Sequence, residues 1–272
     1  MDWNELVRAR YGADAPPLSE SADATLRTIL AHRSVREFRP DPLPVGTLEL
    51  LTAAAQSAAT SSNLQTWSVI ALENAEHKAK AAALSGNQEF IRQAPLFLVF
   101  CADLSRLDFV SAQAGTEGAG LDYVEMFLMA TIDATLAAQN AATAAEALGL
   151  GICYVGGARN HPRELAELLH LPPRVIGIFG MAVGVPNEAK PAEIKPRLPQ
   201  PEVLHREVYR EDERAAQIEH YNATMREFYD AQGMHADADW SRVAAKRVAT
   251  AQSLNGRDVL GEILRERGFE LK

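Results

Sequence analysis

The sequence predicts a mixed fold, either α/β or α+β, in which helices surround a central sheet. Segments with helical spacing and segments typical of strands follow one another along the chain. The apolar run from Leu96 to Cys101 does not alternate with polar residues, which is typical of a strand covered on both faces. The chain has 272 residues, 47% of them hydrophobic, so it can bury a substantial core.

The N-terminal part of the chain is expected to contain an arm and two helices. Paired prolines and scattered charges in residues 1–22 predict a peripheral arm with one short helix. Apolar residues at helical spacing predict a helix over 23–32. Three prolines within 40–44 then impose an extended link. A second helix is expected over 48–58, with Thr47 as its N-cap.

The middle of the chain carries the strongest pattern, a long helix. The elements expected here are a strand at 67–72, a helix at 75–84, a strand at 96–101 and a helix at 121–148. This last helix is apolar or small nearly all round, which predicts that it is buried. A helix of this length needs a surface to cover it, and a second subunit is the simplest candidate. Gly149 and Gly151 provide its stop signal.

The remaining chain mixes short strands and helices. The expected elements are a strand at 152–155, a helix at 162–169, a strand region at 175–185 and two helices at 211–230 and 240–267. Pro162 in the first turn supports the helix that it opens. The sequence shows no internal repeat and no low-complexity tract.

Composition excludes several classes of protein. A formal charge of −9 argues against general binding to nucleic acid or to an anionic membrane. Cys101 and Cys153 form no CxxC and have no zinc-ligand spacing, so no metal is expected and a reducing cytoplasm is indicated. The chain starts with acidic residues, which argues against a signal peptide. Charged and amide residues within 121–148 argue against a membrane span.

Two polar segments are candidates for binding chemistry. In His32–Arg36, guanidinium and hydroxyl donors suit phosphate oxygens, although basic residues also favour a helix C-terminus for electrostatic reasons alone. The segment Thr60–Gln65 offers hydroxyls and amides to a polar ligand, although it could equally be an ordinary turn. Neither segment decides the function by itself.

Two further segments contain glycine or proline at informative positions. The glycines in Gly149–Gly157 would let the backbone approach a flat ligand closely. Their spacing is not GxGxxG, and the sequence also lacks the P-loop, GxSxG and HExxH signatures. In Lys195–Pro199, two prolines stiffen a segment with two cations, which suits an anion site or simply a solvated loop.

Taken in order, five segments resemble the nitroreductase family, and in particular its NADPH-dependent, oxygen-insensitive nitro/flavin reductase branch. These segments are His32–Phe38, Ser61–Gln65, Ser85–Gln88, Leu148–Arg159 and Lys195–Pro199. The resemblance covers the chain from about residue 25 to its C-terminus. It implies an α+β sandwich with a central, mainly antiparallel sheet, and a homodimer in which the long helix lies at the interface. It also implies an arm at 1–22, an FMN-binding core at 23–200 and a helical extension at 201–272 that forms the dimer and cofactor cleft.

The resemblance implies a set of residues that bind FMN. These are His32, Arg33, Ser34, Arg36, Ser61, Ser62, Gln65, Gln88, Tyr154, Val155, Gly156, Gly157, Lys195 and Arg197. Within that set, Arg33, Ser34 and Arg197 would hold the phosphate. Arg36 and Lys195 would lie nearer the ribityl chain and the pyrimidine edge.

Other members of the set would surround the flavin ring. Gln88 would hydrogen-bond its polar edge, and backbone amides of 154–157 would lie near its reactive nitrogen. The loop 61–65 would form one side of the cleft. Arg159 and His235 would face NAD(P)H or the acceptor.

The implied activity is FMN-dependent, ping-pong, two-electron transfer from NAD(P)H to nitroaromatics, quinones or free flavin. No catalytic side chain is expected, because hydride transfer at FMN needs stacking and a backbone donor only. The branch usually has arginines in the loop before the last helix, where they meet the adenosine phosphate of NADPH. The corresponding residues 230–240 of this sequence contain three aspartates and no arginine. Carboxylates repel a 2'-phosphate and can accept hydrogen bonds from a ribose hydroxyl, so NADH or dual donor use is expected as readily as NADPH.

Two alternatives remain open at this point. The chain could keep the flavin fold and perform dehalogenation, flavin breakdown or dehydrogenation, because fold does not fix the reaction. It could also be a helical dimerisation module whose basic segments are surface charge. The physiological acceptor is not specified by the sequence.

Overall fold

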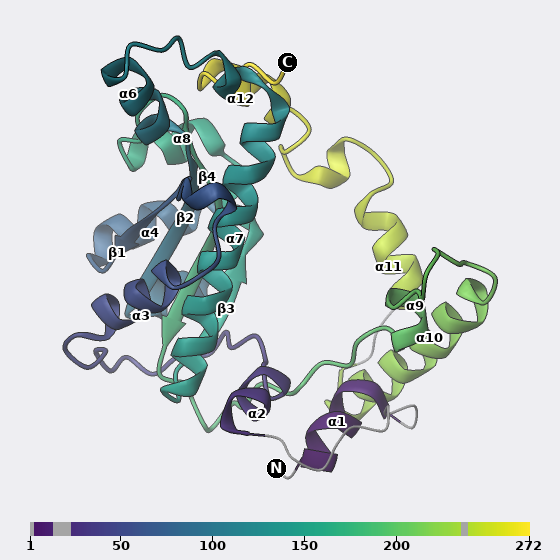
Figure 1. Ribbon diagram of the computed structural model, residues 1–272. Coiled ribbons are helices and arrows are strands. Elements are labelled where there is room, and N and C mark those ends of the chain that lie inside the picture. Colours follow the sequence, from purple (N-terminus) through teal and green to yellow (C-terminus); the bar gives the residue numbers. More distant parts are fainter. Residues whose placement is uncertain (1–2, 13–22, 235–238) are drawn as a thin grey trace. The chain divides into compact units, whose positions relative to one another are not determined.

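The computed structural model describes residues 3–12, 23–234 and 239–272 (Figure 1). It divides into two compact units. One consists of Met1–Arg33 with Glu193–Leu254, and the other of Ser34–Ala192 with Asn255–Lys272.

The second unit is built on an antiparallel sheet of four strands in the order β1-β2-β4-β3. The strands are β1 (Trp67–Leu72), β2 (Leu96–Asp103), β3 (Gly151–Val155) and β4 (Val175–Gly184). Each predicted strand is therefore present, and the expectation of a mainly antiparallel sheet in an α+β fold is confirmed.

Strand β2 is buried along its whole length, as its uninterrupted apolar run predicts. Its alternate side chains enter two different cores, because successive residues of a strand point to opposite faces. Leu98 and Phe100 pack in a cluster with alanines of the long helix α7. Phe97 and Val99 pack in the cluster on the other face.

Helices cover both faces of this sheet. On one side lie α3 (Thr47–Gln56) and α7 (Val124–Ala147), and the other cluster includes residues of α4 (Ala75–Leu84), α5 (Glu89–Gln93) and α8 (Pro162–Leu168). In Figure 1, α7 runs along the sheet. Seven of the eight buried residues of α7 are alanines, which allow a close approach to α3 and the sheet.

The other helices are short. The second unit also contains α6 (Ser105–Gln113), α12 (Leu260–Glu266) and single turns at Ser61–Asn63, Ala119–Asp122 and Gly156–Arg159. The first unit contains α1 (Trp3–Tyr11), α2 (Ala24–Leu30), α9 (Gln200–Val203), α10 (Arg214–Ala231), α11 (Trp240–Arg247) and a turn at Gln252–Leu254. None of the described helices is long and apolar enough to cross a bilayer.

Three details of the predicted helices are wrong. The continuous helix at 240–267 is divided into α11, which ends at Arg247, a turn and α12, and Asn255 and Gly256, with left-handed φ of 55° and 79°, separate the turn from α12. Gly46, with φ of 84°, is the N-cap of α3, and Thr47 is its first residue. The long helix begins at Val124, after a separate turn.

The single chain by itself covers only part of α7. Leu128, Ile132 and Leu136 are 50%, 56% and 42% exposed. Their spacing of four residues places them along one face of the helix. Coverage of this face by a second subunit remains a prediction, as do the domain boundaries at residues 22 and 200.

Candidate functional site

The segment after α2 runs beside strand β3 in the second unit. Ser34 forms a parallel bridge to Ile152, and the Val35 amide donates to the Ile152 carbonyl at 2.9 Å. Gly151 makes this approach possible, because a Cβ there would lie 2.8 Å from the Val35 side chain. Burying Val35 leaves Ser34 and Arg36 exposed on either side of it.

Arg36 is a cation without a carboxylate partner. No hydrogen bond or ion pair joins its guanidinium to another residue in the described ranges. Burial raises the pKa of the neighbouring Cys153 thiol, and the charge of Arg36 opposes that rise. The Arg36 guanidinium is therefore available to an anion or to the polar edge of a ligand.

The end of β3 carries the two glycines that the sequence singles out. A Cβ on Gly157 would overlap the carbonyl oxygen of Ser85, so only glycine fits there. At Gly156 a Cβ would lie 3.6 Å from a guanidinium nitrogen of Arg257 and 3.7 Å from one of Arg159. Two guanidinium groups thus flank a stretch of bare backbone.

Both of these arginines are tied to backbone or side-chain oxygens. Arg159 donates to the Ile178 carbonyl, and Arg257 Nε donates to Asn160 Oδ1 at 2.9 Å. The sequence does not predict a role for Arg257, because helical spacing places it inside the helix expected at 240–267. The dipeptide Asn255-Gly256 before it is a turn signal that could have found this position.

The segment Ser85–Gln88 lies next to these glycines. Gln88 is exposed and is the N-cap of α5. A Cβ on Gly86 would lie 3.4 Å from the Asn160 amide nitrogen and 3.5 Å from that of Gln88. The fold therefore brings the predicted ring-edge ligand close to the turn that follows β3.

The side chain of Tyr154 is partly buried and packs against the hydrophobic core. Its ring packs edge-on against Phe179 with centroids 5.4 Å apart, and its hydroxyl donates to Gln139 Oε1 at 3.4 Å. Burial raises the pKa of this phenol. Any role of Tyr154 in ligand binding therefore falls to its backbone, as the sequence predicts.

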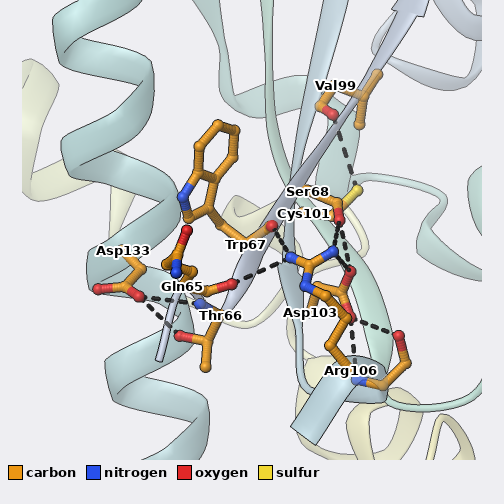
Figure 2. A network of polar contacts seen from close by, with 10 residues as sticks. Gln65, Thr66, Trp67, Ser68, Val99, Cys101, Asp103, Arg106 and Asp133 are labelled. Carbon is orange, nitrogen blue, oxygen red and sulfur yellow. Dashed lines mark hydrogen bonds and ion pairs between the residues drawn. The ribbon is translucent and has the colours of Figure 1, made fainter. Parts of the chain in front are cut away.

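The loop Thr60–Thr66 presents its predicted ligands outward. Ser61, Ser62 and Gln65 are exposed, whereas Thr66 is buried. The inner side of the loop is held by Asp133 of α7 and by Arg106 of α6 (Figure 2). The sequence alone predicts no site role for either residue.

In the first unit, the buried Arg10 donates hydrogen bonds to two of the predicted basic segments. Arg10 donates to the carbonyls of Leu30 at 3.0 Å, His32 at 2.8 Å and Lys195 at 2.9 Å. The end of α2 and the Lys195 segment are thereby fixed to a single guanidinium. Arg33, which directly follows His32, is exposed.

The cations of the Lys195 segment are held by aromatic and backbone groups. Lys195 Nζ lies 5.5 Å from the ring centre of Tyr229, and Arg197 donates to the Lys195 carbonyl at 3.0 Å. Both side chains are exposed, and neither forms an ion pair with a carboxylate in the described part of the chain. His235, the remaining predicted ligand, lies outside the described residues.

These features fit a flat, phosphate-bearing cofactor. Exposed cations without carboxylate partners suit a phosphate, and exposed hydroxyl and amide groups suit a polar ring edge. The glycine turn supplies close backbone access. The two thiols offer no nucleophile, because both are buried and burial raises the pKa of Cys101 to about 12.

Comparison with known proteins bears on the same conclusion. A family model described as "Nitroreductase family" matches residues 29–184, and one described as "Nitroreductase family, C-terminal domain" matches 195–272. The chain is 36% identical to an "FMN reductase (NADPH)" of Bacillus subtilis, over 90% of this chain and 98% of that protein. It is 36% identical to an "Oxygen-insensitive NADPH nitroreductase" of Salmonella typhimurium, over 80% and 88%.

A solved structure resembles the whole chain. The NADPH:FMN oxidoreductase from Vibrio harveyi, complexed with NAD+, superposes with a TM-score of 0.81 at 32% identity. The match covers 92% of this chain and 100% of the other.

Proposed function

The chain belongs to the nitroreductase family, and we propose that it is an FMN-dependent reductase that uses NAD(P)H to reduce nitroaromatics, quinones or free flavin. The observation that carries this function is near full-length similarity to an FMN reductase and a nitroreductase. When bound, FMN supplies the chemistry of accepting a hydride and releasing two electrons to an acceptor.

The proposed FMN ligands are those that the sequence predicts. In the second unit they are Ser34, Arg36, Ser61, Ser62, Gln65, Gln88 and the backbone of 154–157, and in the first unit His32, Arg33, Lys195 and Arg197. The exposure of Arg36 and its lack of a carboxylate partner support its role. Arg257 joins Arg159 as a candidate for contact with NAD(P)H or the acceptor, because both guanidinium groups flank Gly156.

Arg36 has a physical advantage at the polar edge of the ring. Its guanidinium is a cation with several donors in a planar fork, so it stabilises negative charge that develops there on reduction. The hydroxyls and amides of the 61–65 loop orient the ring by hydrogen bonds. No described side chain has to give or take a proton for hydride transfer itself.

A homodimer is the proposed assembly. The exposed apolar face of α7, with Leu128, Ile132 and Leu136, is the surface that a second copy would cover. A cytoplasmic location is proposed as well, because both cysteines are free and buried, as suits a reducing compartment.

The test begins with the visible spectrum of the purified protein. We expect a yellow protein, or a colourless one that takes up added FMN, and NAD(P)H oxidation that depends on a nitroaromatic, a quinone or free flavin. Failure to bind FMN would contradict the proposal. Bound FMN without turnover by either NADH or NADPH would instead favour a family member with a different reaction.

A further inference from the structure

The loop Thr60–Thr66 holds a backbone that its own sequence does not favour. Ser62, Asn63 and Gln65 have φ values of 50°, 55° and 52°. Asparagine tolerates left-handed backbone, but serine and glutamine rarely adopt it, and there it persists only where the surroundings fix it. Three of them within four residues require a strong external constraint.

The constraint comes from one buried carboxylate on α7. Asp133 is 1% exposed, and its Oδ2 accepts from the Thr60 hydroxyl at 2.6 Å. The same oxygen accepts from the amide and the hydroxyl of Thr66, each at 3.0 Å, and Oδ1 accepts from the Ser61 amide at 3.4 Å. Figure 2 shows Asp133 pointing from the helix toward Thr66.

The hydrogen bonds extend from Asp133 to both peptide groups of Gln65. The Gln65 amide donates at 2.9 Å to the Thr60 hydroxyl, which itself donates to Asp133. The Gln65 carbonyl accepts from Arg106 at 3.1 Å, and the amide that follows it belongs to Thr66. Neither peptide plane beside Gln65 can rotate without breaking one of these bonds.

The composition of α7 indicates that the Asp133 carboxylate stabilises the loop rather than the packing of the helix. Its other buried residues are all alanines, which pack closely at no polar cost. A buried carboxylate destabilises the fold through lost hydration unless hydrogen bonds replace the water. Within the part of the chain that the structure describes, the donors to Asp133 come from residues 60–66.

The geometry also separates the two sides of the loop. Its inner donors face Asp133, while Ser61, Ser62 and Gln65 are exposed on the outer side. We propose that Asp133 is a positioning residue that presents these three side chains to the flavin. This inference rests on the proposed function and concerns how the loop of that site is set.

The experiment compares FMN dissociation constants of Asp133→Asn, Asp133→Ala and wild-type protein. Asparagine keeps the shape and one acceptor, but its amide would face a donor. We expect FMN binding to weaken about tenfold in Asp133→Asn and more in Asp133→Ala, because each variant leaves buried donors unpaired. Turnover per bound flavin should change less than the dissociation constant.

Leu169→Ala is the matched control for stability. Leu169 is buried at the end of α8, in the core cluster on the sheet face opposite α7, and that cluster includes no residue of the loop. We expect this variant to lose thermal stability while its FMN dissociation constant stays within about twofold of wild type. The comparison separates positioning from a general loss of folding.

If Asp133→Ala does not fold, Thr60→Val still tests the inference. It removes the hydroxyl between Asp133 and Gln65 and leaves the carboxylate in place. FMN binding should weaken in Thr60→Val, and the double variant with Asp133→Asn should lose less than the product of the two single effects.

Two results would overturn the inference. One is FMN binding by both Asp133 variants within twofold of wild type. The other is an equal loss of binding in Leu169→Ala at the same loss of thermal stability. A wild-type chain that takes up no FMN would instead overturn the proposed function and this inference together, so the two failures are distinguishable.

Discussion

At the residue scale, some positions of the site depend on the charge of a side chain and others on the absence of a side chain. Arg36 is exposed with no hydrogen-bond or ion-pair partner in the described ranges, so its proposed role depends on charge. Gly157 is enclosed by the Ser85 carbonyl, so its role depends on having no side chain. Substitutions at these two positions should therefore fail in different ways.

Arg36→Ala should lose FMN without losing the fold. Removing a hydrogen bond to a charged group costs about 1.5–3 kcal/mol, so the FMN dissociation constant should rise by about 10- to 100-fold. Fluorescence titration with FMN measures it, and the dimer should stay intact by light scattering. Arg39→Ala is the control, because Arg39 is an exposed arginine already paired with Asp41 at 2.7 Å. Equal FMN retention in both variants would contradict the role of Arg36.

Gly157→Ala should destabilise the turn after β3. The added methyl meets the backbone of Ser85 rather than a movable side chain, so the chain itself must shift. Overpacking of this kind costs about 1–3 kcal/mol, and both the melting temperature and FMN affinity should fall. Gly120→Ala is the control, because its Cβ would meet nothing within 4 Å. An unchanged melting temperature in Gly157→Ala would contradict the close approach of Gly157 to the Ser85 carbonyl.

At the scale of elements, α7 has two faces with different tasks. One face packs alanines against α3 and the sheet and carries Asp133 toward the 60–66 loop. The other exposes an apolar row in the single chain. A helix of this kind links the proposed subunit contact to the proposed flavin loop through one rigid element.

Ile132→Glu should disrupt the proposed dimer. A carboxylate placed in an apolar contact loses hydration without gaining a partner, so the subunit dissociation constant should rise at least about 100-fold. Sedimentation measures the effect, and circular dichroism should remain native because Ile132 is exposed in the chain. Phe109→Glu on α6, where Phe109 is 65% exposed, is the control and should leave the assembly unchanged. A wild-type monomer at micromolar concentration would refute the proposed assembly.

At the scale of the whole molecule, similarity extends over nearly the full chain, and the departure from the branch that the sequence predicts concerns residues 230–240. Residues 230–240 hold three aspartates and no arginine. Asp239 pairs with Arg226 of α10, so this carboxylate is already engaged. Asp237 lies outside the described residues.

The donor comparison tests this departure. We expect kcat/KM values for NADPH and NADH within about tenfold of each other, because no arginine in the loop attracts the 2'-phosphate. Met234→Arg, at an exposed position, should raise the NADPH/NADH ratio by about fivefold, the effect of one exposed ion pair. Met234→Gln is the uncharged control. A wild-type preference for NADPH above 100-fold would contradict the expectation.

The sequence by itself determined the order of the elements and the segments that carry the family resemblance. Local signals were sufficient for β2, whose apolar run is buried at every position, and for α4, whose predicted bounds match the structure. Prediction failed at 240–267, where α11 ends at Arg247 and left-handed backbone at Asn255 and Gly256 precedes α12. The flavin ligands that the resemblance implies remain predictions.

Only the tertiary structure identified Asp133, Arg10 and Arg257. Asp133 looks like any polar residue of a helix, and its partners lie 67 to 73 residues away along the chain. Arg10 likewise binds a carbonyl 185 residues away. Hydrogen bonds between distant segments leave no periodic trace in a sequence, because they depend on how the packed elements meet rather than on local preference.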